Sequence, residues 1–196
     1  MGAFRFGPRL DPNGGATFRL WAPAAERVEL VTERTIAMPQ ISGGWFELTV
    51  PEARAGLRYR FRIDGELDVP DPGSHFQPDD VSGPSELIDH AYAWQTADWK
   101  GRPWHDVVFS ELHVGTFTPA GSYRGVMERL DHLVDTGITA IELMPLADFP
   151  GGRNWGYDGV LLYAPDSAYG RPEDLKALVD AAHARGLMVF LDVVYN

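Results

Sequence analysis

Acidic side chains stand near the ends of three apolar segments of the sequence. They are Asp192 in MVFLDVVYN, Glu142 in ITAIELMP, and Glu111 in VVFSEL, which His113 follows directly. A buried acid must be paired or hydrogen-bonded. If the segments are neighbouring parallel strands, their carboxyl ends meet at one edge, and these groups predict a polar site there. The alternative is that the groups satisfy one another and only hold that edge in shape.

A second group of polar and aromatic residues lies in a long loop at 145–170. Asn154, Trp155, Tyr157 and Asp158 bring two aromatic faces and two short polar side chains together. A loop of that length inside a compact fold is usually a binding loop. Sugar rings stack their C–H faces on aromatic rings, and their hydroxyls bond acids and amides. The pattern therefore favours saccharide binding, with simple aromatic packing as the other interpretation.

Composition and charge exclude several classes of function. The chain has 196 residues, a formal net charge of −11 and a pI of about 4.9, so it lacks a basic surface for nucleic acid or anionic membrane. It contains no cysteine, which excludes disulfides and thiolate metal sites. The histidines show no metal-ligand spacing, and nucleotide-binding and serine-hydrolase motifs are missing. We expect no metal, no cofactor, and no nucleic-acid or membrane partner.

Targeting signals are also missing from the sequence. The first residues, MGAFRFGPRL, contain no apolar signal region, and no stretch approaches the ~18 apolar residues of a membrane helix. These features favour a cytoplasmic protein.

The first part of the chain shows the alternation of apolar and polar residues that is typical of short antiparallel strands. LRYRFRID at 57–64 alternates with period two, which indicates a half-buried strand. Asp64 and Gly65 then predict a hairpin turn that needs positive φ at both positions. Similar short stretches, separated by turn clusters such as PNGG and ISGG, predict a small β-sandwich. The Pro-, Gly- and Asp-rich stretch at 68–89 contains apolar residues, so we expect it to pack against another part of the fold.

From Asp106 onward, strands and helices alternate. The predicted elements are a strand at 107–112, a helix through 123–136, a strand at 138–145, a helix through 172–185 and a strand at 187–194. Pro172 suits a first helical turn, and Gly137 and Gly186 stand where left-handed C-caps are needed. This order predicts a parallel α/β sheet with right-handed crossovers, still unfinished at residue 196.

The last strand carries a family resemblance. LDVVYN, taken with GITAIELMP, resembles the third-strand motif Asp-Val-Val-x-Asn-His of the α-amylase superfamily, here from Asp192 to Asn196. DVVFSELHVGTFTPAGSY and NWGYDG resemble a trehalose-releasing subfamily within it, and FRLWAP resembles the immunoglobulin-like module that precedes the barrel there. Two positions depart from relatives: Ser110 replaces a common Tyr, and Asp158 stands where branching enzymes usually carry Gln.

The resemblance implies an architecture and its boundaries. We expect an all-β immunoglobulin-like sandwich followed by the first three βα units of a TIM (β/α)8 barrel, truncated after the third strand. The sandwich would occupy residues 1–93, with a linker from about residue 70, and the incomplete catalytic barrel would occupy 94–196.

The resemblance also implies site residues. Tyr157 would stack against the sugar under attack, and Asp192 would lie beside the bond-cleaving centre. The full substrate-binding set is Tyr157, Asp192, Trp155, Asp158, His113 and Asn196. Asn196 matches a calcium position of many α-amylases, but we predict no calcium here. The family's aspartate nucleophile, glutamate acid/base and third acid lie on the fourth, fifth and seventh strands. We therefore expect no catalytic residue in this chain.

Three functions remain open from the sequence. The first is the N-terminal part of a retaining α-glycosidase that hydrolyses the α-1,4 bond next to the terminal trehalose of a maltooligosyl-trehalose; the chain alone would be inactive. The second is part of a glycogen-branching enzyme, which transfers the cleaved chain. The third is a non-catalytic piece that binds glucan through its sandwich. The expected partner is maltooligosyl-trehalose or another α-1,4-glucan, and the sequence does not predict an oligomeric state.

Overall fold

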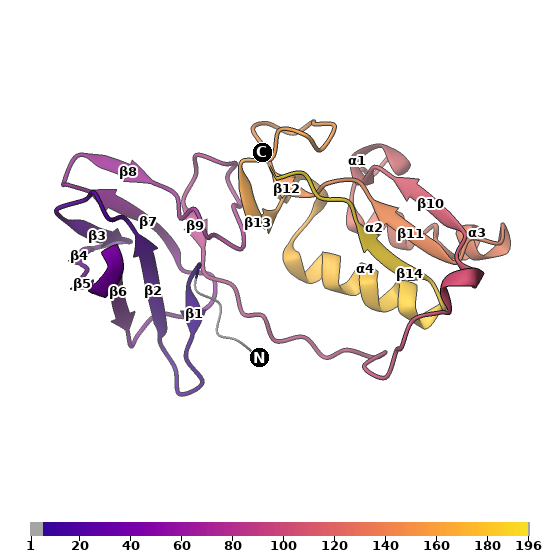
Figure 1. Ribbon diagram of the computed structural model, residues 1–196, viewed down its shortest axis with the longest axis horizontal. Helices are drawn as coiled ribbons and strands as arrows, with labels where there is room; N and C mark the ends of the chain where they lie inside the picture. The colour runs from indigo at the N-terminus through magenta and orange to yellow at the C-terminus, as the bar shows by residue number, and fades with distance from the viewer. Residues whose placement is uncertain (1–5, 196) are drawn as a thin grey trace. The chain divides into compact units, whose positions relative to one another are not determined.

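The structure is a computed structural model that describes residues 6–195, and the chain divides into two compact units between His90 and Ala91 (Figure 1). Unit 1 is built of short strands: β1 Arg9–Leu10, β2 Ala16–Trp21, β3 Val28–Val31, β4 Thr35–Ala37, β5 Gln40–Ile41, β6 Trp45–Val50, β7 Arg58–Ile63, β8 Leu67–Val69 and β9 Ser85–Glu86, with a 3-10 turn at Ser42–Gly44. Unit 2 contains the helices and a parallel sheet.

Unit 1 is a sandwich of two antiparallel sheets. One sheet has the order β1-β2-β6-β5, and the other has β4-β3-β7-β8 with β9 paired to β7. In β7, Tyr59 and Phe61 are buried while Arg58 is exposed, which is the predicted alternation. The inward-facing residues of both sheets form one apolar core that includes Phe18, Leu30 and Phe46. The predicted sandwich is confirmed at this level.

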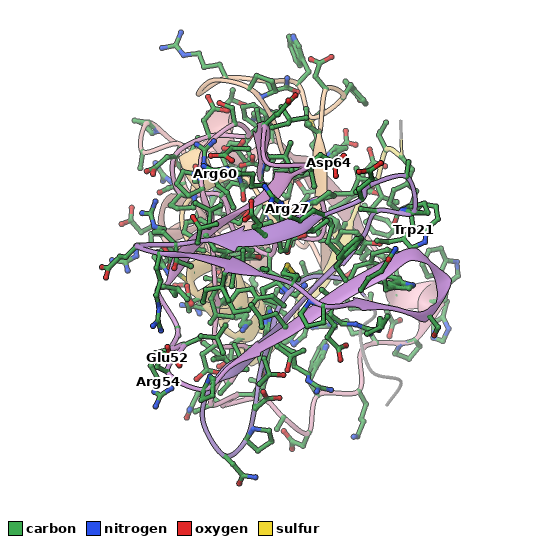
Figure 2. The ribbon with its side chains drawn as sticks, turned by 90° about the vertical axis from the view of Figure 1, so that its left-hand side faces the viewer. Trp21, Arg27, Glu52, Arg54, Arg60 and Asp64 are labelled. Carbon is green, nitrogen blue, oxygen red and sulfur yellow. The ribbon has the colours of Figure 1, made fainter. Side chains whose placement is uncertain are left out.

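The hairpin between β7 and β8 turns where the sequence predicts it. Asp64 and Gly65 have φ values of 51° and 80°, so both positions are left-handed. The Asp64 carboxylate also accepts hydrogen bonds from the backbone N–H groups of Glu26 and Arg27, each at 2.9 Å. Figure 2 shows Arg27 and Asp64 next to each other at the end of the sandwich. The turn is therefore fastened to the loop that precedes β3.

The segment after β8 packs on the sandwich, as its apolar residues predict. Phe76, Leu87 and Ile88 are buried. Asp71 is 2% exposed and accepts hydrogen bonds from the Tyr59 hydroxyl and the Gly73 N–H, both at 2.7 Å. Burial raises the pKa of Asp71 to about 6, although these two donors oppose the rise. The segment thus contributes a buried polar cluster to unit 1.

Unit 2 is organised around a parallel sheet. Its strands are β10 Phe109–Leu112, β11 Ala140–Leu143 and β14 Met188–Leu191, in the order β10-β11-β14. A short antiparallel pair, β12 Ala147–Asp148 and β13 Leu161–Pro165, stands apart from that sheet. The helical elements are a 3-10 turn at Trp104–Asp106, α1 Val114–Phe117, α2 Tyr123–Met127, α3 Leu130–Asp135, a 3-10 turn at Ser167–Tyr169 and α4 Pro172–Ala184.

One sheet face is covered by helices and the other is largely bare. Ile141 and Leu143 pack with α2, α3 and α4 residues in one buried cluster. Glu111, Glu142 and Phe190 share one register position on the opposite face. Glu111 is exposed and the other two are half-buried. Among the described residues, the helices therefore all cover a single face of this sheet.

The predicted elements were too long at three places. The strands expected at 107–112, 138–145 and 187–194 cover only four residues each. The helix expected through 123–136 is wrong, because it breaks into α2 and α3 between Met127 and Leu130. Tyr123, Val126, Leu130 and Leu133 are all buried at helical spacing. Since the break preserves this periodicity, the apolar pattern cannot reveal it.

The helix predicted from Pro172 is confirmed, and it anchors the start of unit 2. α4 begins at Pro172 and ends at Ala184, with Arg185 as its C-cap. Gly186 follows with a φ of 74°, the left-handed conformation predicted there. The Asp180 carboxylate accepts from the backbone N–H of Gln95 and of Thr96, each at 3.0 Å, and from the Thr96 hydroxyl at 2.6 Å. The segment that opens unit 2 is therefore tied to the middle of its longest helix.

Candidate functional site

His113 stands at the carboxyl end of β10, where the chain turns directly into α1. Its Nε2 lies 2.6 Å from the carbonyl oxygen of Asn154. Because a carbonyl oxygen only accepts, this nitrogen carries the proton. The other ring nitrogen, Nδ1, is buried without a hydrogen-bond partner in the part of the chain that the structure describes. Tyr169 meets the ring edge-on, with centroids 5.9 Å apart. His113 is thus directed at the long loop.

The Asn154 side chain forms hydrogen bonds within the loop, to the residues that follow it. Its Oδ1 accepts from the Gly156 N–H at 2.6 Å, and its Nδ2 donates to the Asp158 carboxylate at 2.8 Å. Gly156 has a φ of 100°, and a Cβ there would lie 2.9 Å from Pro145 Cδ. Glycine is required on both counts. Trp155 lies between the residues that these hydrogen bonds join, and it is 76% exposed.

A cavity of about 420 Å³ lies between this loop and the turn after β10. Its lining residues are His113, Gly115, Thr116, Gly152, Arg153, Asn154, Trp155 and Tyr169. They offer an aromatic face, hydroxyls, an amide and a guanidinium, which suits a neutral polyhydroxy ligand. None of these eight described residues carries a carboxylate. Glycoside hydrolysis uses two carboxyl groups that flank the bond, and these eight residues do not supply them.

Tyr169 forms the buried wall of the cavity and is held by Asp166. The Asp166 carboxylate accepts from the N–H of Ala168 at 2.7 Å and from the N–H of Phe149 at 3.0 Å. Burial, with a smaller contribution from the Asp166 charge, raises the pKa of Tyr169 to about 12. The phenol therefore stays neutral near pH 7. The sequence interpretation missed Tyr169 and Asp166, although an Asp that caps a helical turn just after a strand is a readable signal.

The predicted site residues do not all meet in one place. His113 and Trp155 line the cavity, and Asp158 bonds Asn154 beside it. Tyr157 lies in the same loop, 51% exposed, but is not part of the lining. Asp192 is half-buried at a separate hollow of about 130 Å³, next to Pro145 and Leu162. Asn196 lies outside the described residues.

The acids near the strand ends do not form one cluster with His113. Glu111 and Glu142 stand opposite each other in the register, on the face that the helices leave bare. Asp192 bonds the sheet through its backbone, whose N–H donates to Leu143 at 2.9 Å. His113 turns to Asn154 instead. Within residues 6–195 no group of three or more His, Asp or Glu side chains could hold a metal ion, and no helix there is long and apolar enough to cross a membrane.

Two family models match this chain. The catalytic-domain model of alpha amylase matches residues 82–196, and the model of carbohydrate-binding module 48, described as the isoamylase N-terminal domain, matches residues 5–75. The chain belongs to the alpha-amylase family, and it combines such a module with part of the catalytic domain.

Curated relatives share most of this chain. It is 51% identical to a malto-oligosyltrehalose trehalohydrolase of Deinococcus radiodurans over 98% of its own length, and 45% identical to one of Saccharolobus solfataricus over 97%. A 1,4-alpha-glucan branching enzyme of Nocardia farcinica is 33% identical over 93%. The chain spans about a third of the length of these relatives, with 32%, 34% and 27% covered, respectively.

A solved structure shares the fold. A crystal structure described as that of an alpha amylase from Salmonella typhimurium superposes with a TM-score of 0.95 at 44% identity. The match covers 98% of this chain and 33% of that one. The arrangement of elements in both units therefore recurs in a longer protein.

Proposed function

We propose that this chain is the N-terminal part of a retaining α-glycosidase that hydrolyses the α-1,4 bond next to the terminal trehalose of a maltooligosyl-trehalose and releases trehalose. The observation that carries this proposal is the identity of 51% to a trehalohydrolase, kept over 98% of the chain and through both units. The cavity beside His113 supports the binding half of the reaction, since it offers stacking and hydrogen-bonding groups without a carboxylate.

The proposal includes the finer architecture and the site residues. Unit 1 would be an immunoglobulin-like module within 1–93, and 94–196 would supply the first three of eight βα units. Tyr157, Trp155 and Asp158 would bind the glucan, with Asp192 beside the reacting bond. Three parallel strands with one bare face support a sheet that continues in a longer polypeptide. The catalytic acids would come from that continuation, so the 196-residue chain alone would be inactive.

Product analysis tests the proposal. A longer polypeptide that contains this chain is incubated with maltotriosyl-trehalose, and the products are separated by chromatography. Free trehalose with maltotriose is the expected outcome. The 196-residue chain, assayed in parallel, should release neither sugar. Intact substrate after incubation with the longer polypeptide would refute the proposal.

A branching enzyme is the second candidate, because the Nocardia farcinica relative shares 33% of its residues over most of the chain. Incubation of the longer polypeptide with amylose distinguishes the two activities. New α-1,6 linkages in the proton NMR spectrum would favour branching. The loop differs from the branching-enzyme pattern at Asp158. Its carboxylate accepts a hydrogen bond from Asn154, whereas the Gln that branching enzymes usually carry there would present an amide.

A third candidate is glucan binding without catalysis, which the match of residues 5–75 to a carbohydrate-binding module favours. Affinity electrophoresis of the chain in a gel that contains soluble glucan tests it. Retardation relative to a gel without glucan supports binding, and equal migration in both gels contradicts it.

A further inference from the structure

We propose that His113 is a positioning residue: it holds the loop Asn154–Asp158 in its binding shape and does not itself contact the sugar. This inference rests on the proposed function, in which that loop binds an α-glucan. It also differs from the direct contact that the sequence suggests for His113.

The two ring nitrogens of His113 are both unavailable to a ligand. Nε2–H donates to the Asn154 carbonyl at 2.6 Å. Nδ1, the remaining acceptor, is buried away from solvent. A histidine that binds a sugar hydroxyl must present one nitrogen to the cavity. The short polar link of His113 toward the site is therefore the one to the loop backbone, and a longer contact of 3.4 Å joins the same Nε2 to the Tyr169 hydroxyl.

Asn154 passes this restraint to the rest of the loop. Its carbonyl is held by His113, while its side chain bonds the Gly156 N–H and the Asp158 carboxylate. These contacts bracket Trp155 on both sides along the chain. Because Trp155 is 76% exposed, packing restrains it little, and the backbone must set its direction. A Trp155 side chain whose backbone is already held loses less conformational entropy on ligand binding than one on a mobile loop.

The His113 imidazole is itself tightly packed. A Cβ on Gly115 would lie 3.0 Å from His113 Cε1 and 3.0 Å from Tyr169 Cε1, so the two rings close tightly around this glycine. Tyr169 is 3% exposed and stands at 87° to the imidazole. The imidazole therefore has little freedom to turn away from the loop.

The test uses the longer polypeptide and three variants. His113→Phe keeps a ring against Tyr169 but removes the donor, and His113→Gln returns an N–H donor near the position of Nε2. His132→Gln, at an exposed position of α3, is the matched control. Amide hydrogen exchange at 151–158 is measured without substrate, and KM and kcat are measured with maltotriosyl-trehalose.

We expect His113→Phe to speed exchange at 151–158 by about tenfold, the loss of one hydrogen bond. KM should rise by about the same factor while kcat changes less than about twofold, because a loosened platform weakens ground and transition states alike. His113→Gln should recover most of both effects. The His132 variant should change neither.

Three results would overturn the inference: unchanged loop exchange in His113→Phe, a loss confined to kcat, or no recovery in His113→Gln. The exchange measurement needs no substrate. If the unmodified polypeptide released no trehalose, the proposed function would fail, while exchange in the variants would still decide the role of His113.

Discussion

Replacement of Asp71 by Asn is expected to remove a pH dependence from the stability of unit 1. The Asp71 carboxyl is buried, and burial raises its pKa from 3.8 to about 6. Between these two values the folded chain holds a proton on Asp71 that the unfolded chain has released. The extra stability is therefore fully present below about pH 4 and is lost as pH rises through about 6.

The size of the effect follows from the same values. At about 1.4 kcal/mol per pH unit, a pKa raised from 3.8 to about 6 corresponds to about 3 kcal/mol. Asp71 is 2% exposed, so solvent screens its carboxyl little. Asn carries no charge at any pH. The free energy of unfolding of the unmodified chain, minus that of Asp71→Asn, should thus fall by about 2.5 kcal/mol between pH 4 and 7, because a small part of the effect is already lost at pH 4.

Native-state amide exchange at β7 measures this difference in the 196-residue chain, after correction for the intrinsic pH dependence of exchange. Asp68→Asn is the control, because the hydrogen bonds from Arg62 lower the pKa of Asp68. The free energy of unfolding of the unmodified chain, minus that of Asp68→Asn, should rise with pH below about pH 4 and stay nearly level between pH 4 and 7. Parallel pH profiles for Asp71→Asn and the unmodified chain, within about 1 kcal/mol, would refute the argument from burial.

Three further changes test unit 2. The Tyr123 hydroxyl is buried with no partner among residues 6–195, so Tyr123→Phe should raise the free energy of unfolding by about 1 kcal/mol in urea titrations, and a loss would contradict this. Asp180→Ala removes three acceptor contacts and should speed amide exchange at Thr96 by roughly tenfold or more; an unchanged rate would argue against the anchor. A Cβ at Gly125 would overlap Thr118 Oγ1, so Gly125→Ala should cost about 1–3 kcal/mol, and an unchanged thermal midpoint would show that the threonine moves aside.

The fold could be predicted from the sequence wherever the signal is local. The turn at Asp64 and Gly65 follows from residue types that tolerate positive φ, and the start of α4 follows from Pro172. The break between α2 and α3 could not be predicted, because Val126 and Leu130 keep helical spacing across it. Periodicity reports which face is buried and not whether the backbone is continuous.

The site was predictable only in part, because it is built from contacts that are distant in sequence. The loop that contains Trp155 could be found from its length and composition. The pairing of His113 with the Asn154 backbone spans 41 residues, and a main-chain acceptor leaves no trace in side-chain type. Tyr169 was missed for a related reason: the Asp166 cap predicts the helical turn, but nothing in the sequence distinguishes a tyrosine that lines a cavity from one in the ordinary core. The placement of Asp192 in the site stays a prediction.

The hydrogen bonds between Asp180 and the segment Gln95–Thr96 have a consequence for the order in which unit 2 folds during synthesis. The partners are 84 and 85 residues apart in the chain. During synthesis, at about 5–20 residues per second, the segment leaves the ribosome several seconds before α4 exists to receive it. Such distant pairings close late in folding. We therefore expect the beginning of unit 2 to be among its last parts to reach the native structure.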